Sequence, residues 1–343
     1  MSQFIVTTSP ILRNTMLNEL KAIDASCRCE KHFGNGLYLV SFARDHDAVT
    51  AEIVREHHAF MKHIHRVQIQ GRLHNELLAD AETLKGCIGK LGLSAGRPFS
   101  IQARSVENDA YTSKDIEVKL GRHIEQAYSI EAYFDDYDVP DDAGQQIISL
   151  LICGGAFFMG LGSERENLHP VSDPYRIFSR RRGHVSRAEF KLREALRIIG
   201  YSPAPGRLAI DVGAAPGGWS FVLAEHGMNV IAIDPADMDE RVANHENVTH
   251  LKMKAEEYSG AEPVDLIVND MNVDPTDSAT AVLAAGGNLK RGGLLVMTVK
   301  LPNGPYQKQV TDVIGILSPQ FECIDVRCLF FNRQEFTGFF KRI

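Results

Sequence analysis

Segments with the patterns of strands and helices alternate along residues 185–343, and this alternation constrains the fold more than any other feature of the chain. Apolar runs typical of strands buried on both faces occur at 207–213, 229–234, 248–253, 264–270 and 294–300. Helical patterns occur at 186–200, from 217, at 277–288 and from 306, and two more strand patterns close the chain at 321–330 and 335–343. Because parallel strands need crossover connections, we predict an α/β fold with a doubly wound, Rossmann-like sheet. Such sheets bind ligands beyond the carboxyl ends of their strands.

Two smaller α+β segments and a linker precede this block. Residues 1–72 follow a β-α-β-β-α-β rhythm that is typical of a ferredoxin-like domain, with strands at 4–8, 36–42 and 64–70 and helices at about 11–24 and 46–60. Residues 73–165 combine helices near 75–92 and 112–128 with strands at 98–106, 145–154 and 156–162. A basic linker at 166–184 leads to the α/β domain at 185–343.

The charge of the chain is unevenly distributed. The 37 basic and 44 acidic residues give a net charge of −7, which taken alone argues against a nucleic-acid partner. Residues 176–197, however, carry eight basic side chains and only two acidic ones. A basic stripe attracts phosphates, although it is also typical of a solvated helix face.

The sequence argues against a membrane, secreted or zinc-binding protein. It contains no run of 18 apolar residues and no signal-peptide pattern. Its six cysteines are scattered without a CxxC pair, a spacing that favours reduced thiols and a cytoplasmic location. His57, His58, His63 and His65 lack the cysteine or carboxylate pattern that would complete a metal site, so we propose no metal.

A glycine-rich loop joins the first strand of the α/β block to a helix, with the sequence AIDVGAAPGGWS at 209–220. Asp234 ends the next strand, where a carboxylate can accept hydrogen bonds from ribose hydroxyls. Pro216 removes an N–H that a pyrophosphate could use, so the loop favours a cofactor without phosphates, such as S-adenosylmethionine. An NAD site and a turn that serves only packing are the alternatives. The cofactor-binding candidates are Asp211, Gly213, Ala214, Pro216, Gly217, Gly218, Trp219, Asp234 and Asp270.

Charged residues also occur where the pattern places the carboxyl ends of strands. Asp270 follows one apolar strand and Lys300 ends another, while Lys191 lies on the helix before the first strand and Glu335 opens the last. Singly, each is an ordinary charged residue at a strand end. Together they are expected to line the edge of the sheet where the cofactor binds.

Five ordered motifs resemble those of the FtsJ-type ribose 2′-O-methyltransferases: SRAEFKL (186–192), DVGAAPGGWS (211–220), VNDM (268–271), VKLP (299–302) and NRQEFTGFFKRI (332–343). The last two resemble the RlmM branch, which modifies large-subunit ribosomal RNA. The resemblance covers about residues 176–343 and implies a catalytic tetrad of Lys191, Asp270, Lys300 and Glu335. The N-terminal segments resemble, more weakly, the ferredoxin-like and THUMP pair with which some RNA-modifying enzymes hold RNA. Where many family members have an acid near the adenine, this chain has Lys254 or Ala255, and Glu256 is the open alternative.

The tetrad suggests how a ribose hydroxyl is activated. A lysine is a base only when neutral, so we expect Lys300 to be the general base and the nearby cation Lys191 to favour its neutral form. Asp270 is expected to orient Lys300 and face the sulfonium, and Glu335 to position Lys191 or the ribose. The balance between Asp270 and Lys191 stays open at this point.

The expected partner is structured RNA, held by the arginines Arg180, Arg181, Arg182 and Arg187 immediately before Lys191. Trp219 could stack on a base, but packing under the sheet is the favoured interpretation. Ribosomal RNA of the large subunit is the preferred substrate and transfer RNA the runner-up, and no DNA partner is expected. A non-catalytic RNA-binding or assembly factor with the same fold is the alternative from another class of protein.

Overall fold

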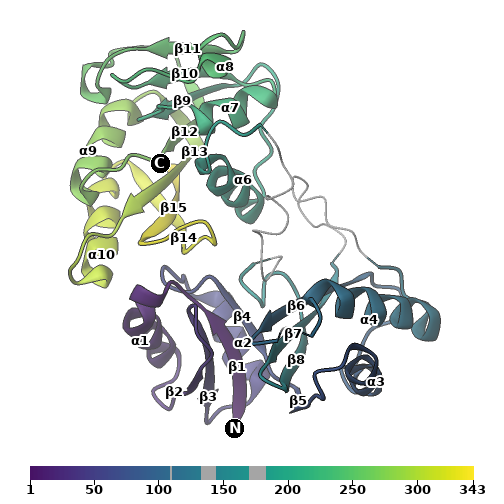
Figure 1. Ribbon diagram of the computed structural model, residues 1–343. Coiled ribbons are helices and arrows are strands. Elements are labelled where there is room, and N and C mark those ends of the chain that lie inside the picture. Colours follow the sequence, from purple (N-terminus) through teal and green to yellow (C-terminus); the bar gives the residue numbers. More distant parts are fainter. Residues whose placement is uncertain (109, 133–143, 170–182) are drawn as a thin grey trace. The chain divides into compact units, whose positions relative to one another are not determined.

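The computed structural model describes residues 1–108, 110–132, 144–169 and 183–343 (Figure 1). The chain divides into two compact units, one formed by Met1–Glu56 with Met61–Ile177 and the other by His57–Phe60 with Phe178–Ile343. The finer division predicted at residues 72, 165 and 184 stays a prediction. Within the described ranges, no helix has the length and apolar character needed to cross a membrane.

The second unit is built on a seven-stranded sheet with the order β11-β10-β9-β12-β13-β15-β14. Its strands are β9 (Leu208–Val212), β10 (Asn229–Ile233), β11 (Val248–Leu251), β12 (Val264–Asn269), β13 (Leu289–Lys300), β14 (Phe321–Arg327) and β15 (Glu335–Arg342). The first five run parallel, and β15 pairs antiparallel with both β13 and β14. This arrangement confirms the predicted doubly wound α/β fold.

Helices cover both faces of this sheet (Figure 1). They are α6 (Ala188–Ile199), α7 (Gly218–Glu225), the short α8 (Glu240–Ala243), α9 (Pro275–Gly286) and α10 (Tyr306–Leu317). Leu192 and Leu196 of α6 and Trp219 and Leu223 of α7 pack on one face in a core that extends to Phe339 of β15. The other face carries α9 and α10.

The strand order reverses beside β9, since β10 lies on one side of it and β12 on the other. The connections that leave β9 and β12 therefore diverge and open a crevice at the carboxyl edge, the usual place for a ligand in such a sheet. The loop Gly213–Gly217 and the residue Asp270 both lie at this point.

The first unit contains two four-stranded sheets. One has the order β2-β3-β1-β4 and consists of β1 (Ser2–Thr7), β2 (Arg28–His32), β3 (Leu37–Phe42) and β4 (His63–Arg66), with α1 (Arg13–Ile23) and α2 (His46–Arg55) in the connections. The other has the order β5-β8-β7-β6 and consists of β5 (Ile69–Arg72), β6 (Phe99–Val106), β7 (Gln146–Cys153) and β8 (Ala156–Gly162), with α3 (Leu77–Ile88) and α4 (Ser113–Tyr128).

The single strand predicted at 64–70 is wrong, because two strands of different sheets share this range. Strand β4 pairs with β1, whereas β5 pairs with β8. The chain passes from one sheet to the other at Val67 and Gln68, whose N–H groups donate to Gln3 and to Met159 respectively. An apolar pattern shows that such residues are extended, but it does not show which strand each half adjoins.

Candidate active site

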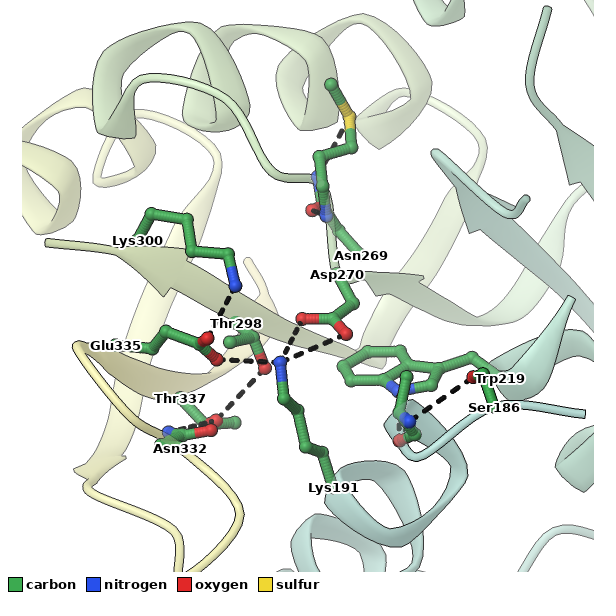
Figure 2. A network of polar contacts seen from close by, with 12 residues as sticks. Ser186, Lys191, Trp219, Asn269, Asp270, Thr298, Lys300, Asn332, Glu335 and Thr337 are labelled. Carbon is green, nitrogen blue, oxygen red and sulfur yellow. Dashed lines mark hydrogen bonds and ion pairs between the residues drawn. The ribbon is translucent and has the colours of Figure 1, made fainter. Parts of the chain in front are cut away.

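Four charged side chains from separate elements meet at the carboxyl edge of the seven-stranded sheet (Figure 2). Nζ of Lys191 lies 2.9 and 3.2 Å from the two carboxylate oxygens of Asp270 and 2.7 Å from Oε2 of Glu335. Oε1 of Glu335 accepts a hydrogen bond of 2.5 Å from Nζ of Lys300. Two carboxylates and two ammonium groups therefore alternate along one chain of contacts.

Strand register explains why Lys300 and Glu335 meet. Lys300 ends β13, Glu335 begins β15, and the two are direct partners in the antiparallel pair. Side chains of such partners lie on the same face and within reach of each other. Asp270 follows β12, which is the neighbour of β13 on its other side.

The start of α6 places Lys191 above this edge. The carboxylate of Glu189 accepts hydrogen bonds from the N–H groups of Val185 and Ser186. The hydroxyl of Ser186 accepts a hydrogen bond of 3.2 Å from the N–H of Ala188. These contacts fix the first turn of the helix and, with it, the position of Lys191.

The four side chains differ in how exposed they are, and the pKa values of Lys191, Asp270 and Glu335 are shifted by burial and by their charged neighbours. Their exposed fractions are 11% for Lys191, 15% for Asp270, 7% for Glu335 and 27% for Lys300, so Lys300 is the most accessible. Burial acts to lower the pKa of Lys191, but Asp270 and Glu335 outweigh it and raise that pKa. Burial acts to raise the pKa of Glu335, but Lys191 and Lys300 lower it overall. Burial raises the pKa of Asp270, although Lys191 opposes the rise.

The predicted contact of Asp270 with Lys300 is wrong. Asp270 pairs with Lys191, and the carboxylate that contacts Lys300 is that of Glu335. The reason is geometric: α6 brings the Lys191 ammonium between β12 and β15, where it occupies the space between the two carboxylates (Figure 2). The prediction that Glu335 positions Lys191 agrees with this geometry.

The predicted cofactor loop turns sharply between β9 and α7. Gly213 and Gly217 have φ values of 72° and 111°, in the region that favours glycine. A Cβ at Gly213 would lie 2.1 Å from Cγ of Met271, so no side chain fits there. The N–H groups of Gly213 and Ala214 donate to the carbonyl of Ile233, which ties the loop to β10.

Two aspartates flank this loop in different environments. Asp234 is half-buried, and its two oxygens accept from the N–H groups of Ala215 and Ala236 at 3.0 and 2.8 Å. Asp211 is 1% exposed and accepts a hydrogen bond of 2.7 Å from the hydroxyl of Ser220. Burial raises the pKa of Asp211 to about 7, although the Ser220 hydrogen bond opposes the rise. The predicted contact of Asp211 with a ligand stays a prediction.

Trp219 is a packing residue. Its side chain belongs to the core beneath the sheet, and its indole N–H donates to the carbonyl of Ala188 at 2.8 Å. With the residue only 2% exposed, neither face of the ring is open to a base or to a cofactor. The placement of Trp219 among the cofactor-binding candidates is therefore wrong, and the packing interpretation holds.

The predicted RNA-binding arginines are described only in part. Arg180, Arg181 and Arg182 lie outside the described residues. Arg187 is exposed and precedes Lys191 by four residues, about one helical turn, so both lie on the same side of the start of α6.

Comparison with known proteins matches residues 184–327 to the family described as FtsJ-like methyltransferase. These residues form an FtsJ-like methyltransferase domain. Lys191, Asp270 and Lys300 fall within the matched range of the methyltransferase domain, and Glu335 lies beyond its end.

Two curated relatives resemble this chain over part of its length. The ribosomal RNA large subunit methyltransferase M of Methylococcus capsulatus is 30% identical over 174 residues, which are 47% of this chain and 49% of the relative. The protein of the same name from Pseudomonas aeruginosa is 30% identical over 217 residues, 59% of this chain and 60% of the relative. The chain thus spans between about half and three-fifths of the curated relatives that it matches. Among solved structures, TrmN from Thermus thermophilus aligns over 100% of both chains at 16% identity, with a TM-score of only 0.40.

Sequence reasoning missed three buried polar residues next to the tetrad: Thr298, Asn332 and Thr337. All three appear beside the tetrad in Figure 2. The available signal was weak, a threonine two residues before Lys300 in a strand that is otherwise apolar, and another two residues after Glu335.

Proposed function

We propose that this protein transfers a methyl group from S-adenosylmethionine to a ribose 2′-hydroxyl of structured RNA, with large-subunit ribosomal RNA as the favoured substrate. The observation that carries the proposal is the buried chain of Asp270, Lys191, Glu335 and Lys300 beside the glycine loop of the methyltransferase domain. Buried charges are costly and are seldom kept without a role in structure or chemistry.

The residues around the loop fit the cofactor. The oxygens of Asp234 each accept one backbone N–H and keep further lone pairs, which can accept from two ribose hydroxyls. Gly213 and Gly217 let the backbone approach a ligand closely, and Ala214 and Pro216 lie between them. When bound, S-adenosylmethionine supplies an electrophilic methyl group on its sulfonium. The acidic Asp270 at the end of β12 favours a positive charge close to this position.

Lys300 is the residue best placed to accept the proton of the ribose hydroxyl. It is the most exposed of the four, so a substrate can reach it. Asp270 and Glu335 raise the pKa of Lys191, and Lys191 shares the carboxylate of Glu335 with Lys300. Attack by the hydroxyl requires Lys300 to be neutral, because only a neutral amine can take up the proton.

Large-subunit ribosomal RNA is favoured because the curated relatives carry that substrate in their name. The exposed Arg187 is a contact for an RNA phosphate on the same side of α6 as Lys191, and the arginines Arg180, Arg181 and Arg182 extend the basic stripe along the sequence. Transfer RNA stays the second candidate substrate. A ferredoxin-like and THUMP-like first unit that holds the RNA, and a cytoplasmic location, stay predictions.

The decisive experiment compares Lys300→Ala with Lys290→Ala, a lysine at the other end of the same strand that pairs with Asp265. We expect Lys300→Ala to lower methyl transfer to RNA by roughly 10²–10⁴-fold, since that is the usual cost of losing a well-placed base. Binding of S-adenosylmethionine, measured by calorimetry, should stay close to that of the unaltered protein. Lys290→Ala should retain transfer.

The RNA substrate and the role of Lys300 are tested by separate measurements. Maps of 2′-O-methylation in ribosomal and transfer RNA, with and without the gene, identify the RNA and the nucleotide. Substantial turnover by Lys300→Ala would remove Lys300 from the role of base. If the unaltered protein binds RNA but transfers no methyl group to either RNA, it is a non-catalytic binding factor.

A further inference from the structure

A pair of threonines lies one layer beneath the charged tetrad. Thr298 and Thr337 are direct partners in the pair β13–β15, as are Lys300 and Glu335 two residues further along. Since side chains two residues apart point to the same face of a strand, both pairs lie on the face that carries α6.

Along this face of the sheet, the side chains change from apolar to polar and then to charged toward the carboxyl edge. Val296 and Phe339 are partners within the apolar core, Thr298 and Thr337 come next, and Lys300 and Glu335 are last. The threonine pair thus separates an apolar core from a cluster of charges. Valine would fill the same volume, so packing alone does not explain the two hydroxyls.

The two hydroxyls and the amide of Asn332 form a short chain of hydrogen bonds. Both threonines are 0% exposed, and Asn332, in the connection before β15, is 1% exposed. The amide of Asn332 donates to Oγ1 of Thr337 at 3.1 Å, and Oγ1 of Thr337 lies 3.1 Å from Oγ1 of Thr298. Because an amide NH₂ only donates, Thr337 accepts from Asn332, and either hydroxyl can be the donor between Thr337 and Thr298.

We propose that Asn332, Thr337 and Thr298 are positioning residues whose hydrogen-bonded dipoles, in the layer beneath Glu335, hold it in its charged form, and through Glu335 the two lysines; this inference rests on the proposed function. Fixed dipoles in a site that excludes water stabilise charge more than the same groups do in solvent, because they need no reorientation. β-branched side chains held by hydrogen bonds also keep a single rotamer, which gives the Glu335 side chain a rigid support.

The test is Thr337→Val, which keeps the shape of the side chain and removes the hydroxyl. We expect kcat for methyl transfer to fall by about 10-fold to 100-fold, as when outer-layer partners of reactive groups are lost, with KM for S-adenosylmethionine and for RNA little changed. The acid limb of the pH–kcat profile should shift, because Glu335 holds its charge less firmly. Thr337→Ser, which restores the hydroxyl, should return both kcat and the profile toward those of the unaltered protein.

Phe339→Leu is the matched control. Phe339 lies two residues along the same strand face and is 0% exposed, but its side chain carries no hydrogen bond. We expect this variant to unfold at a lower temperature while its kcat and pH profile stay close to those of the unaltered protein. If Phe339→Leu and Thr337→Val lower kcat equally, the threonine acts by packing and the proposal is wrong.

A double-mutant cycle tests the inference without activity. Thr337→Val should lower the unfolding temperature more in the unaltered protein than in the Glu335→Gln variant, because the dipole of the Thr337 hydroxyl acts on the charge of Glu335. Equal shifts in the two backgrounds would overturn the proposal. If the unaltered protein transfers no methyl group, the proposed function fails, and the cycle still decides whether the threonines support Glu335.

Discussion

The two units bury polar side chains in opposite ways. The second unit keeps Lys191 and Glu335 charged, each within 3 Å of an opposite charge. The first unit buries His63 and His65 on β4, 1% and 6% exposed. Burial lowers the pKa of both histidines, with Arg104 adding to the effect, and that of His65 falls to about 3.

The difference shows how each unit meets the cost of removing a charge from water. In the second unit every buried charge of the tetrad has an opposite charge in contact, which offsets the cost of its burial. In the first unit, no hydrogen-bond partner contacts either ring nitrogen of His65 among the described residues, and the imidazole stays neutral. In the tetrad the buried charges are paired with one another, whereas the buried His65 is neutral.

The largest effect on stability is expected from Lys191→Met, which removes the cation that two buried carboxylates share. Breaking a buried ion pair on one side typically costs about 3–5 kcal/mol, because an uncompensated charge is left behind. Chemical denaturation followed by the fluorescence of Trp219, the single tryptophan, reports this change for the second unit.

The same substitution at an exposed pair is the control. Lys252 contacts Asp237 at 2.6 Å on the surface of the second unit. Lys252→Met should leave the unfolding midpoint nearly unchanged, since exposed pairs contribute little. Similar losses for both variants would mean that burial does not distinguish the tetrad from a surface pair.

The next largest effect is expected from Asp211→Asn. The pKa of Asp211 is about 7 in the folded protein against an ordinary 3.8, so the folded state holds the proton better than the unfolded state. Stability is therefore lost as pH rises from about 4 to 7, and above pH 7 the buried charge is a constant penalty. At pH 8 Asp211→Asn should stabilise the second unit by a few kcal/mol, because each pKa unit corresponds to about 1.4 kcal/mol.

Asp265→Asn should act in the opposite direction. Burial acts to raise the pKa of Asp265, but hydrogen bonds from Lys290, Leu208 and Arg207 lower it overall. Asp265→Asn should therefore destabilise the unit at pH 8. Thermal unfolding of both variants at pH 5 and pH 8, followed at Trp219, separates the two signs. A loss of stability at pH 8 for Asp211→Asn would contradict the assignment of a buried, penalised charge.

Sequence patterns predicted most of the second unit because its parallel strands are buried on both faces. Such strands are continuous apolar runs, and those of β9 and β12 stand out from their surroundings. Strand β2 was not among the predicted strands, because Arg28–His32 is polar, mostly exposed and lies at a sheet edge. Its extended shape comes from pairing with β3, which a local pattern does not contain.

The membership of the tetrad was predictable, but its pairing was not. Position at strand ends was enough to group Asp270, Lys300 and Glu335 at one edge. Which carboxylate contacts which lysine depends on side-chain directions from α6, β13 and β15 together, and a linear sequence does not contain these. The burial of Asp211 was missed for the same reason, since it lies next to loop residues that the motif marks as ligand-binding, whereas packing was already the favoured interpretation of Trp219.

The smallest effect, and the one that tests the first unit, is the acid sensitivity caused by His65. Its folded pKa of about 3 lies below the ordinary 6.5, so the unfolded state binds the proton better. Its contribution to stability is complete above about pH 6.5 and is lost progressively as the pH falls toward 3, at up to about 1.4 kcal/mol per pH unit. His65→Leu should flatten this slope, measured as the protection of the amides of β4 from hydrogen exchange between pH 7 and 5, after correction for intrinsic rates.

The exposed His74 supplies the control, because His74→Leu should leave the slope as it is. If the slope survives in His65→Leu, the acid sensitivity of the first unit originates at other groups such as His63, and the contrast between the two units does not rest on His65.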